Sequence, residues 1–223
     1  MIRRFTILAA LAAVAFATTQ FLSARNVMPS PVGQALAQDA KDIDTSMIRE
    51  MTLGNPDAAV TVIEYASFTC PHCATFHAGP YKQLKAEYID AGLINFVYRE
   101  VYFDRFGLWA GITARCGEGA ESRYFGIVEM LYEQQRDWAA SAGGAHEIVE
   151  KLRRIGKTAG LTDSDLDGCF TDGDRAQALY ALYLQNAEAD GVRSTPSFVI
   201  DDKLHGNMSY AELKALIDEA LDG

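Results

Sequence analysis

Two of the four cysteines in this 223-residue chain stand close together, in the tetrapeptide Cys70-Pro71-His72-Cys73. The tetrapeptide follows an apolar, β-branched run at residues 60–66 and precedes a helix-like stretch, so the first sulfur is expected at the amino end of a helix. Free backbone N–H groups and the positive end of the helix dipole stabilise a thiolate at such a position. The pattern therefore predicts a nucleophilic thiol at Cys70 and a resolving thiol, one turn later, at Cys73.

The two residues between the sulfurs suit the same chemistry. Pro71 fits the first helical position, because its missing N–H would be unpaired there anyway. His72 could donate to the Cys70 sulfur or add positive charge, which would make that thiolate a better leaving group. Two other interpretations stay open: a structural disulfide, or a zinc site that adds a histidine such as His77 to the two sulfurs. Disulfide exchange needs no soluble cofactor, and we expect neither a cofactor nor a metal.

The first residues fit a secretory signal. Arg3 and Arg4 precede an uncharged apolar run at residues 5–17, and small residues around Ala37 fit a cleavage site. The run has 13 residues, fewer than the roughly 20 that span a bilayer. We therefore predict a signal peptide over residues 1–37 and a periplasmic protein, with an uncleaved membrane anchor as the alternative.

The charge balance and the remaining cysteines limit the partners. The formal net charge is −10, and removal of the three arginines in the signal would bring it near −13. Such an acidic surface argues against nucleic acid as a partner. With Cys116 and Cys169, the cysteines are even in number, and disulfides are expected in an oxidising compartment. The simplest pairing is a structural Cys116–Cys169 bridge, and a second redox relay is the alternative.

Two strands and a helix are predicted around the tetrapeptide. Residues 60–66 and 93–98 are apolar runs of strand length. The stretch between them, 71–91, is helix-like, with an expected break at Gly79-Pro80 because proline removes a helix hydrogen bond. Strand, helix and strand in this order favour a parallel pair with a right-handed crossover. The sequence therefore indicates an α/β fold.

A helical insertion is predicted to interrupt this unit from residue 103 to 187, before the chain returns to strand at 197–200. Within it, helices are expected at four segments: 106–116, 124–135, 147–155 and 175–186. A short strand at 203–205 and a helix that begins with a Ser209/Glu212 capping box should follow.

With the tetrapeptide in this context, the sequence resembles the DsbA family of bacterial disulfide oxidases over nearly the whole mature chain. The stretches that carry the resemblance are residues 54–57, 62–65, 68–73 and 191–198. The resemblance implies a thioredoxin-like fold with an inserted helical domain. Its thioredoxin-like domain would comprise two parts, 38–102 and 188–223, and the insertion would be 103–187.

The resemblance also implies roles for residues outside the tetrapeptide. Thr195 and Pro196 would form a cis-proline loop opposite the sulfurs and bind substrate, although Thr-Pro before a strand is by itself more typical of a trans turn. Glu64 is the one charged residue in the predicted central strand, and it could pass a proton to or from Cys73. The alternative for Glu64 is a strand residue that faces solvent. His77, like two other histidines of the chain, is expected to be a surface or packing residue.

The expected function is a thiol-disulfide oxidase that donates the Cys70–Cys73 disulfide to reduced or unfolded exported proteins. A DsbB-like membrane quinone reductase would reoxidise it, and we expect a monomer. A disulfide isomerase or reductase is one alternative, but family isomerases carry an amino-terminal dimerisation domain. Only 22 residues, 38–59, separate the predicted cleavage site from the first predicted strand. A periplasmic chaperone is the alternative from another class, and the intact cysteine pair argues against it.

Overall fold

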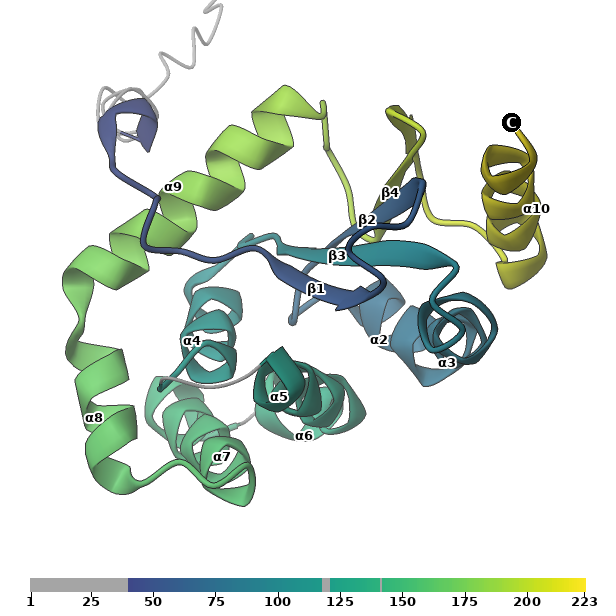
Figure 1. Cartoon of the computed structure of the whole chain (residues 1–223). Coiled ribbons are helices and arrows are strands. Elements are labelled where there is room, and N and C mark those ends of the chain that lie inside the picture. Colours follow the sequence, from purple (N-terminus) through teal and green to yellow (C-terminus); the bar gives the residue numbers. More distant parts are fainter. Residues whose placement is uncertain (1–39, 118–120, 141) are drawn as a thin grey trace, which may run out of the picture.

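The computed structural model describes residues 40–117, 121–140 and 142–223 (Figure 1). The predicted signal peptide, residues 1–37, lies outside the described residues. Within the described ranges, no helix is both long enough and apolar enough to cross a membrane.

A mixed five-stranded sheet, formed by the described strands, lies at the centre of the molecule in the order β1-β3-β2-β4-β5 (Figure 1). The strands are β1 (Met51–Gly54), β2 (Val60–Ala66), β3 (Ile94–Glu100), β4 (Ser197–Ile200) and β5 (Lys203–His205). β2 pairs in parallel with β3, and the other neighbouring strands are antiparallel. The predicted parallel pair is therefore confirmed, and β2 is the central strand.

Alternation along β2 gives the sheet two different faces, because successive side chains of a strand point to opposite sides. Val62 and Ala66 belong to the main core, whereas Tyr65 belongs to a second cluster with residues of β4 and the loop after β3. Glu64 shares the face of Val62 and Ala66 and is 0% exposed. The parity of the strand thus directs one carboxylate into the interior.

Helices cover both faces of the sheet. The main-core face carries α2 (Pro71–Ala78), α3 (Pro80–Leu84), the π-helical turn η1 (Lys85–Ile89) and α10 (Tyr210–Asp222). α9 (Gly173–Ala189) covers the other face, where Tyr183 and Ala187 pack on the cluster around Tyr65. The expected break at Gly79-Pro80 separates α2 from α3 and is confirmed. The capping box of Ser209 and Glu212 at the start of α10 is present as well.

The inserted helices gather beside one end of the sheet (Figure 1). They are α4 (Arg105–Ala114), α5 (Glu121–Glu133), α6 (Gln135–Trp138), α7 (Gly144–Thr158) and α8 (Asp163–Thr171), and α9 then leads the chain back to β4. The architecture is a thioredoxin-like fold with an inserted helical region, as predicted from the sequence.

Three elements, β1, α6 and α8, have no counterpart in the sequence prediction. β1 is a four-residue strand that pairs with β3 at the edge of the sheet, and so short a segment shows little alternation. α8 is poor in apolar residues, but Thr162 and Asp165 form a capping box at its start. This box was a readable signal for a helix at that position.

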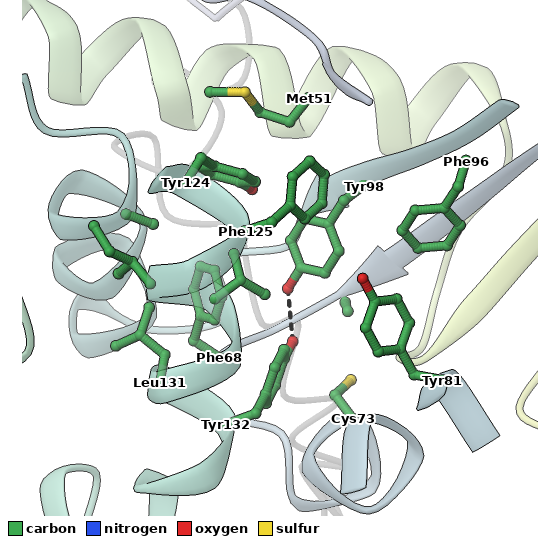
Figure 2. Packing of buried hydrophobic residues seen from close by; sticks show 14 of the residues in the cluster. Met51, Phe68, Cys73, Tyr81, Phe96, Tyr98, Tyr124, Phe125, Leu131 and Tyr132 are labelled. Atoms are coloured by element: carbon green, nitrogen blue, oxygen red, sulfur yellow. Dashed lines mark hydrogen bonds between the residues drawn. The ribbon is translucent and has the colours of Figure 1, made fainter. Parts of the chain in front are cut away.

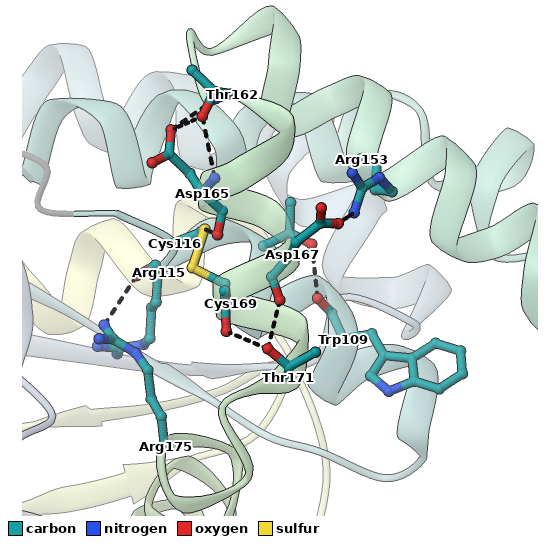
Figure 3. Close-up of a disulfide and its surroundings, with 12 residues drawn as sticks. Trp109, Arg115, Cys116, Arg153, Thr162, Asp165, Asp167, Cys169, Thr171 and Arg175 are labelled. Atoms are coloured by element: carbon teal, nitrogen blue, oxygen red, sulfur yellow. Dashed lines mark hydrogen bonds and ion pairs between the residues drawn. A yellow bond between two sulfur atoms is a disulfide. The ribbon is translucent and has the colours of Figure 1, made fainter.

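A buried ion pair and a disulfide connect the inserted helices. Arg115, just after α4, binds both carboxylate oxygens of Glu100 at 2.6 and 2.7 Å, and the Tyr124 hydroxyl donates to the same carboxylate at 2.7 Å. These contacts join β3, α4 and α5. The next residue, Cys116, is bonded to Cys169 in α8 (Figure 3). The predicted Cys116–Cys169 bridge is therefore present.

Replacing both Cys116 and Cys169 with serine should lower the free energy of unfolding by up to about 4 kcal/mol. The bridge joins residues 53 positions apart, so its loss gives the unfolded chain more conformations. Denaturant titration of the double variant against the wild type measures the loss. Because the bridge lies in the helical region, iodoacetamide should alkylate Cys70 at the wild-type rate. A folded double variant with a changed alkylation rate would contradict a purely structural bridge.

Candidate active site

The tetrapeptide lies where β2 ends and α2 begins. Cys70 is the N-cap residue of α2, with extended backbone, and Pro71 occupies the first helical turn as expected. A turn closed by the Cys70 N–H donating to the Ser67 carbonyl at 3.0 Å leads into the helix. Cys70 is half-buried and Cys73 is fully buried, and in this structure their sulfurs are not bonded to each other. The exposed sulfur is thus the one predicted to be the nucleophile.

The two thiols have very different proton affinities. The pKa of Cys70 is lowered to about 5, first by a hydrogen bond from the Cys73 thiol and further by the Thr195 hydroxyl and the backbone amides of Cys73 and His72. Burial is the main cause that raises the pKa of Cys73 far above its ordinary value. A proton leaving the pair therefore leaves Cys70, and Cys73 stays a neutral donor.

His72 contributes to the Cys70 thiolate through its backbone amide. Its imidazole is exposed and makes no hydrogen bond to the described residues. From the sequence, the amino end of the helix was expected to be the main cause of a lowered Cys70 pKa and the His72 imidazole the second. In the structure the largest cause is the Cys73 thiol. The reason is geometric: the side chain at the second helical position points outward, while its N–H points back along the helix axis toward the sulfur.

The Thr195-Pro196 peptide bond is cis, as the resemblance implied, and it precedes β4. The Cys70 thiol donates to the Thr195 carbonyl at 3.4 Å, which places this loop against the sulfur. The Thr195 hydroxyl oxygen is buried and has no hydrogen-bond partner among the described residues. It is therefore available to donate to a Cys70 thiolate.

Glu64 is not a solvent-facing residue, and that alternative is wrong. Its carboxylate lies 3.0 and 3.2 Å from Nε2 of His77, which is one turn beyond Cys73 in α2. The side chains of both partners are almost completely buried, with exposures of 0% and 4%. His77 is thus not a surface residue either. The spacing Cys73 to His77 is the i, i+4 pattern that puts two side chains on one helix face.

Cys73 and His77 lie on the buried face of α2, which is turned toward Glu64. The negative charge of Glu64 contributes to the raised pKa of Cys73, after burial and the hydrogen bond to Cys70. Figure 2 shows the Cys73 side chain directed toward the buried tyrosines, where the Tyr98 and Tyr132 hydroxyls are 2.6 Å apart. In the described ranges, no three His, Cys, Asp or Glu side chains are grouped so that they could hold a metal ion.

A family model described as thioredoxin matches residues 46–219. The chain belongs to this thioredoxin family. A solved structure of α-DsbA1 from Wolbachia pipientis superposes with a TM-score of 0.71 at 25% identity, covering 80% of this chain and 96% of the other. A protein-disulfide isomerase from Novosphingobium aromaticivorans gives a TM-score of 0.69 at 25% identity, covering 78% and 98%.

Sequence relatives of this thioredoxin-family chain also have names that refer to disulfide chemistry. A Rickettsia bellii protein, provisionally named a protein-disulfide oxidoreductase, is 33% identical over 173 residues, or 78% of this chain and 65% of the relative. The corresponding Rickettsia felis protein is also 33% identical, and this chain covers 60% of it. The chain thus spans less than two thirds of the length of these relatives.

Two residues of the insertion hold the active-site loop of this thioredoxin-family chain, and the sequence did not reveal them. The buried Gln135 amide, at the start of α6, donates to the carbonyls of Phe68 and Cys70 at 2.8 and 2.9 Å. Asp104 accepts from the Thr69 hydroxyl at 2.8 Å and also caps α4. Asp104 before a helix was a readable capping signal, whereas no local pattern marks Gln135.

Gln135→Leu should lower the free energy of unfolding by about 1–3 kcal/mol, because it leaves the buried Phe68 carbonyl without its donor. The matched control is Gln134→Leu, since Gln134 is the neighbouring exposed glutamine. The control should change stability by less than about 0.5 kcal/mol. Denaturant titrations measure the free energy of unfolding of both variants. Equal decreases in this free energy would show that the Gln135 amide does not tether the loop.

Proposed function

We propose that this chain is a thiol-disulfide oxidase that donates the Cys70–Cys73 disulfide to exported proteins through a mixed disulfide. The difference between the two thiols carries this proposal: the pKa of Cys70 is lowered to about 5, and burial raises that of Cys73. A stable Cys70 thiolate is a good leaving group. Whatever stabilises the reduced protein also makes its disulfide a stronger oxidant, by linkage.

The proposed reaction balances in two exchanges. A substrate thiolate attacks the Cys70 sulfur, the Cys70–Cys73 bond breaks, and Cys73 leaves and takes a proton. A second substrate thiolate then attacks the substrate sulfur of the mixed disulfide and releases Cys70 as a thiolate. Two substrate thiols are oxidised and two enzyme sulfurs are reduced. One of the two protons lost by the substrate ends on Cys73, and the other enters solvent.

Glu64 is the proposed source of the proton for Cys73. The Cys73 thiolate formed in the first exchange is buried, and its high proton affinity makes protonation strongly favourable. Glu64 is buried on the face of the sheet that α2 covers, and its charge helps to raise the pKa of the Cys73 thiol. A buried carboxyl beside a buried thiolate can act as a general acid, and as a general base in the reverse direction.

Thr195 and Pro196 form the proposed substrate-binding loop. The Cys70 sulfur touches the Thr195 carbonyl, so a chain bonded to that sulfur would pass directly along the loop. Backbone pairing with an extended segment selects for an unfolded conformation more than for a particular sequence. This loop would therefore accept many reduced or unfolded clients.

The proposed location is the periplasm, with residues 1–37 as the export signal. The proposed reoxidant is a DsbB-like membrane quinone reductase, and the proposed working form is a monomer. A disulfide isomerase or reductase remains the second candidate, because one of the structural neighbours is named a protein-disulfide isomerase. The redox equilibrium of the cysteine pair distinguishes these two candidates.

The oxidised protein should convert a reduced dithiol peptide to its disulfide in a one-to-one reaction. Mass spectrometry after acid quench and alkylation follows both partners. Cys70→Ser should abolish the reaction, because it removes the attacked sulfur. With a peptide that carries a single thiol, Cys73→Ser should accumulate a mixed disulfide once Cys70 is activated as a disulfide with a small thiol. If Cys70→Ser still suppressed aggregation of an unfolded protein and wild type oxidised nothing, a chaperone would replace the oxidase.

The reduced protein should be more stable than the oxidised one at neutral pH. The pKa of Cys70 is depressed to about 5 in the fold, from an unfolded value of about 8.5. An acid whose pKa is lower in the folded state stabilises the fold fully above its unfolded pKa. This stabilisation is lost as the pH falls through its folded pKa. The advantage of the reduced form should thus shrink steadily from about pH 8 to about pH 5.

The measurement is a set of denaturant titrations of both redox forms across that range, with the Cys116–Cys169 bridge intact in each. Oxidation removes the thiolate and closes only a very short loop, for which the entropic gain is small. An oxidised form that is more stable at neutral pH would identify the protein as a reductase.

A further inference from the structure

His77 is held in an unusual place for an ionisable side chain. It is 5% exposed and lies between two aromatic rings, with centroids 4.4 Å from Tyr81 and 4.1 Å from Tyr132. Both ring pairs are stacked, with interplanar angles of 29° and 20°. The stacking fixes the plane of the imidazole, so its two nitrogens have fixed neighbours.

The two nitrogens of His77 have different surroundings. Nε2 faces the Glu64 carboxylate, to whose oxygens it donates in the tautomer that carries its proton there. Nδ1 is buried and has no hydrogen-bond partner in the part of the chain that the structure describes. A buried nitrogen without a partner is costly, which calls for an explanation beyond packing. In a neutral imidazole protonated at Nε2, Nδ1 is a basic site that can accept a proton.

A cavity of about 510 Å³ lies against His77. It opens between α2, α3 and η1 on one side and α5 on the other, and both stacking tyrosines line it together with His77. Its charged lining residues are the following: Lys82, Lys85, Asp90, Glu129 and Glu133. The imidazole therefore stands between this polar-rimmed cavity and the buried Glu64 carboxylate.

We propose that His77 is the positioning residue that carries protons between the cavity and Glu64, so that the proton exchanged at Cys73 enters and leaves through the cavity. This inference rests on the proposed function only in requiring that the Cys70–Cys73 pair be oxidised and reduced. A water or hydronium ion in the cavity gives a proton to Nδ1, and Nε2 releases its own proton to Glu64. Glu64 protonates the Cys73 thiolate, and the charge of the system balances at each transfer.

The other ionisable groups around His77 are poor substitutes for this path. Tyr81 of α3, Tyr98 of β3 and Tyr132 of α5 all have raised pKa values, mainly because they are buried, so they remain neutral. Cys73 on α2 itself is the acceptor. The lysines and carboxylates of α3, η1, α5 and the turn after η1 lie at the cavity lining, where they can exchange protons with solvent. β4 contacts α2 through an apolar ring, because Phe198 packs against Phe76.

The test uses reduction of the oxidised Cys70–Cys73 disulfide by dithiothreitol, which works for an oxidase and a reductase alike. His77→Gln retains a donor for Glu64 but cannot pass a proton between two nitrogens. Its single-turnover rate, corrected for the dithiothreitol thiolate, should fall about tenfold or more between pH 5 and pH 8. His146→Gln is the matched control, because His146 is an exposed helical histidine of α7, and it should react like wild type.

A second variant separates proton transfer from packing. His77→Ala enlarges the cavity, and added imidazole should restore its rate, whereas pyrazole, with the same shape and far weaker basicity, should not. Glu64→Gln should lower the single-turnover rate as well. The double variant with His77→Gln should react only slightly more slowly than Glu64→Gln alone, because both residues serve one path.

Wild-type rates in folded His77→Gln, or equal rescue by imidazole and pyrazole, would overturn the role of His77. Failure of the proposed function is seen separately, as wild-type protein that cannot oxidise a peptide while the dithiothreitol rates still depend on His77.

Discussion

The contrast between a half-buried Cys70 thiol of lowered pKa and a buried Cys73 thiol of raised pKa is the constraint on which the site depends. It requires one sulfur to be buried and to keep its proton, and the other to reach solvent and lose it. The start of α2 supplies this difference, because its N-cap residue stands at the surface and its third residue faces the sheet. Oxidation removes the thiolate, and we therefore expect the fold to favour the reduced pair.

The parity of β2 determines what lies beneath the buried sulfur. Glu64 faces α2 because it is two residues from both Val62 and Ala66, which line the main core. A shift of one residue in the strand would turn Glu64 toward α9 and bring Tyr65 or Ile63 under the helix. His77 meets the carboxylate from above through the i, i+4 spacing from Cys73. The buried hydrogen-bonded pair of His77 and Glu64 thus follows from two periodicities: two residues along a strand and 3.6 residues along a helix.

The sequence predicted those parts of the site that depend on local patterns. The tetrapeptide at a strand-to-helix junction and the break at Pro80 follow from residue type and spacing alone, and the structure confirms both positions. The cis bond before Pro196 came from the resemblance. The pairing of Glu64 with His77 and the tether from Gln135 join segments distant in the chain, so no local pattern reports them. The sequence suggested surface or packing for His77 because a lone histidine carries no signal of its partner.

The two cysteine pairs show that position, and not residue type, decides the chemistry of a thiol. Cys70 and Cys73 sit at a helix start, where a thiolate gains hydrogen bonds from a thiol, a hydroxyl and backbone amides. Cys116 is 2% exposed and follows α4, so it lies at the carboxyl end of a helix and not at an amino end. The Cys116 sulfur is therefore shielded from a thiolate in solvent, Cys169 is partly exposed, and the bridge joins the end of α4 to α8. The bridge can therefore stabilise the arrangement of the inserted helices while the Cys70–Cys73 pair is oxidised and reduced.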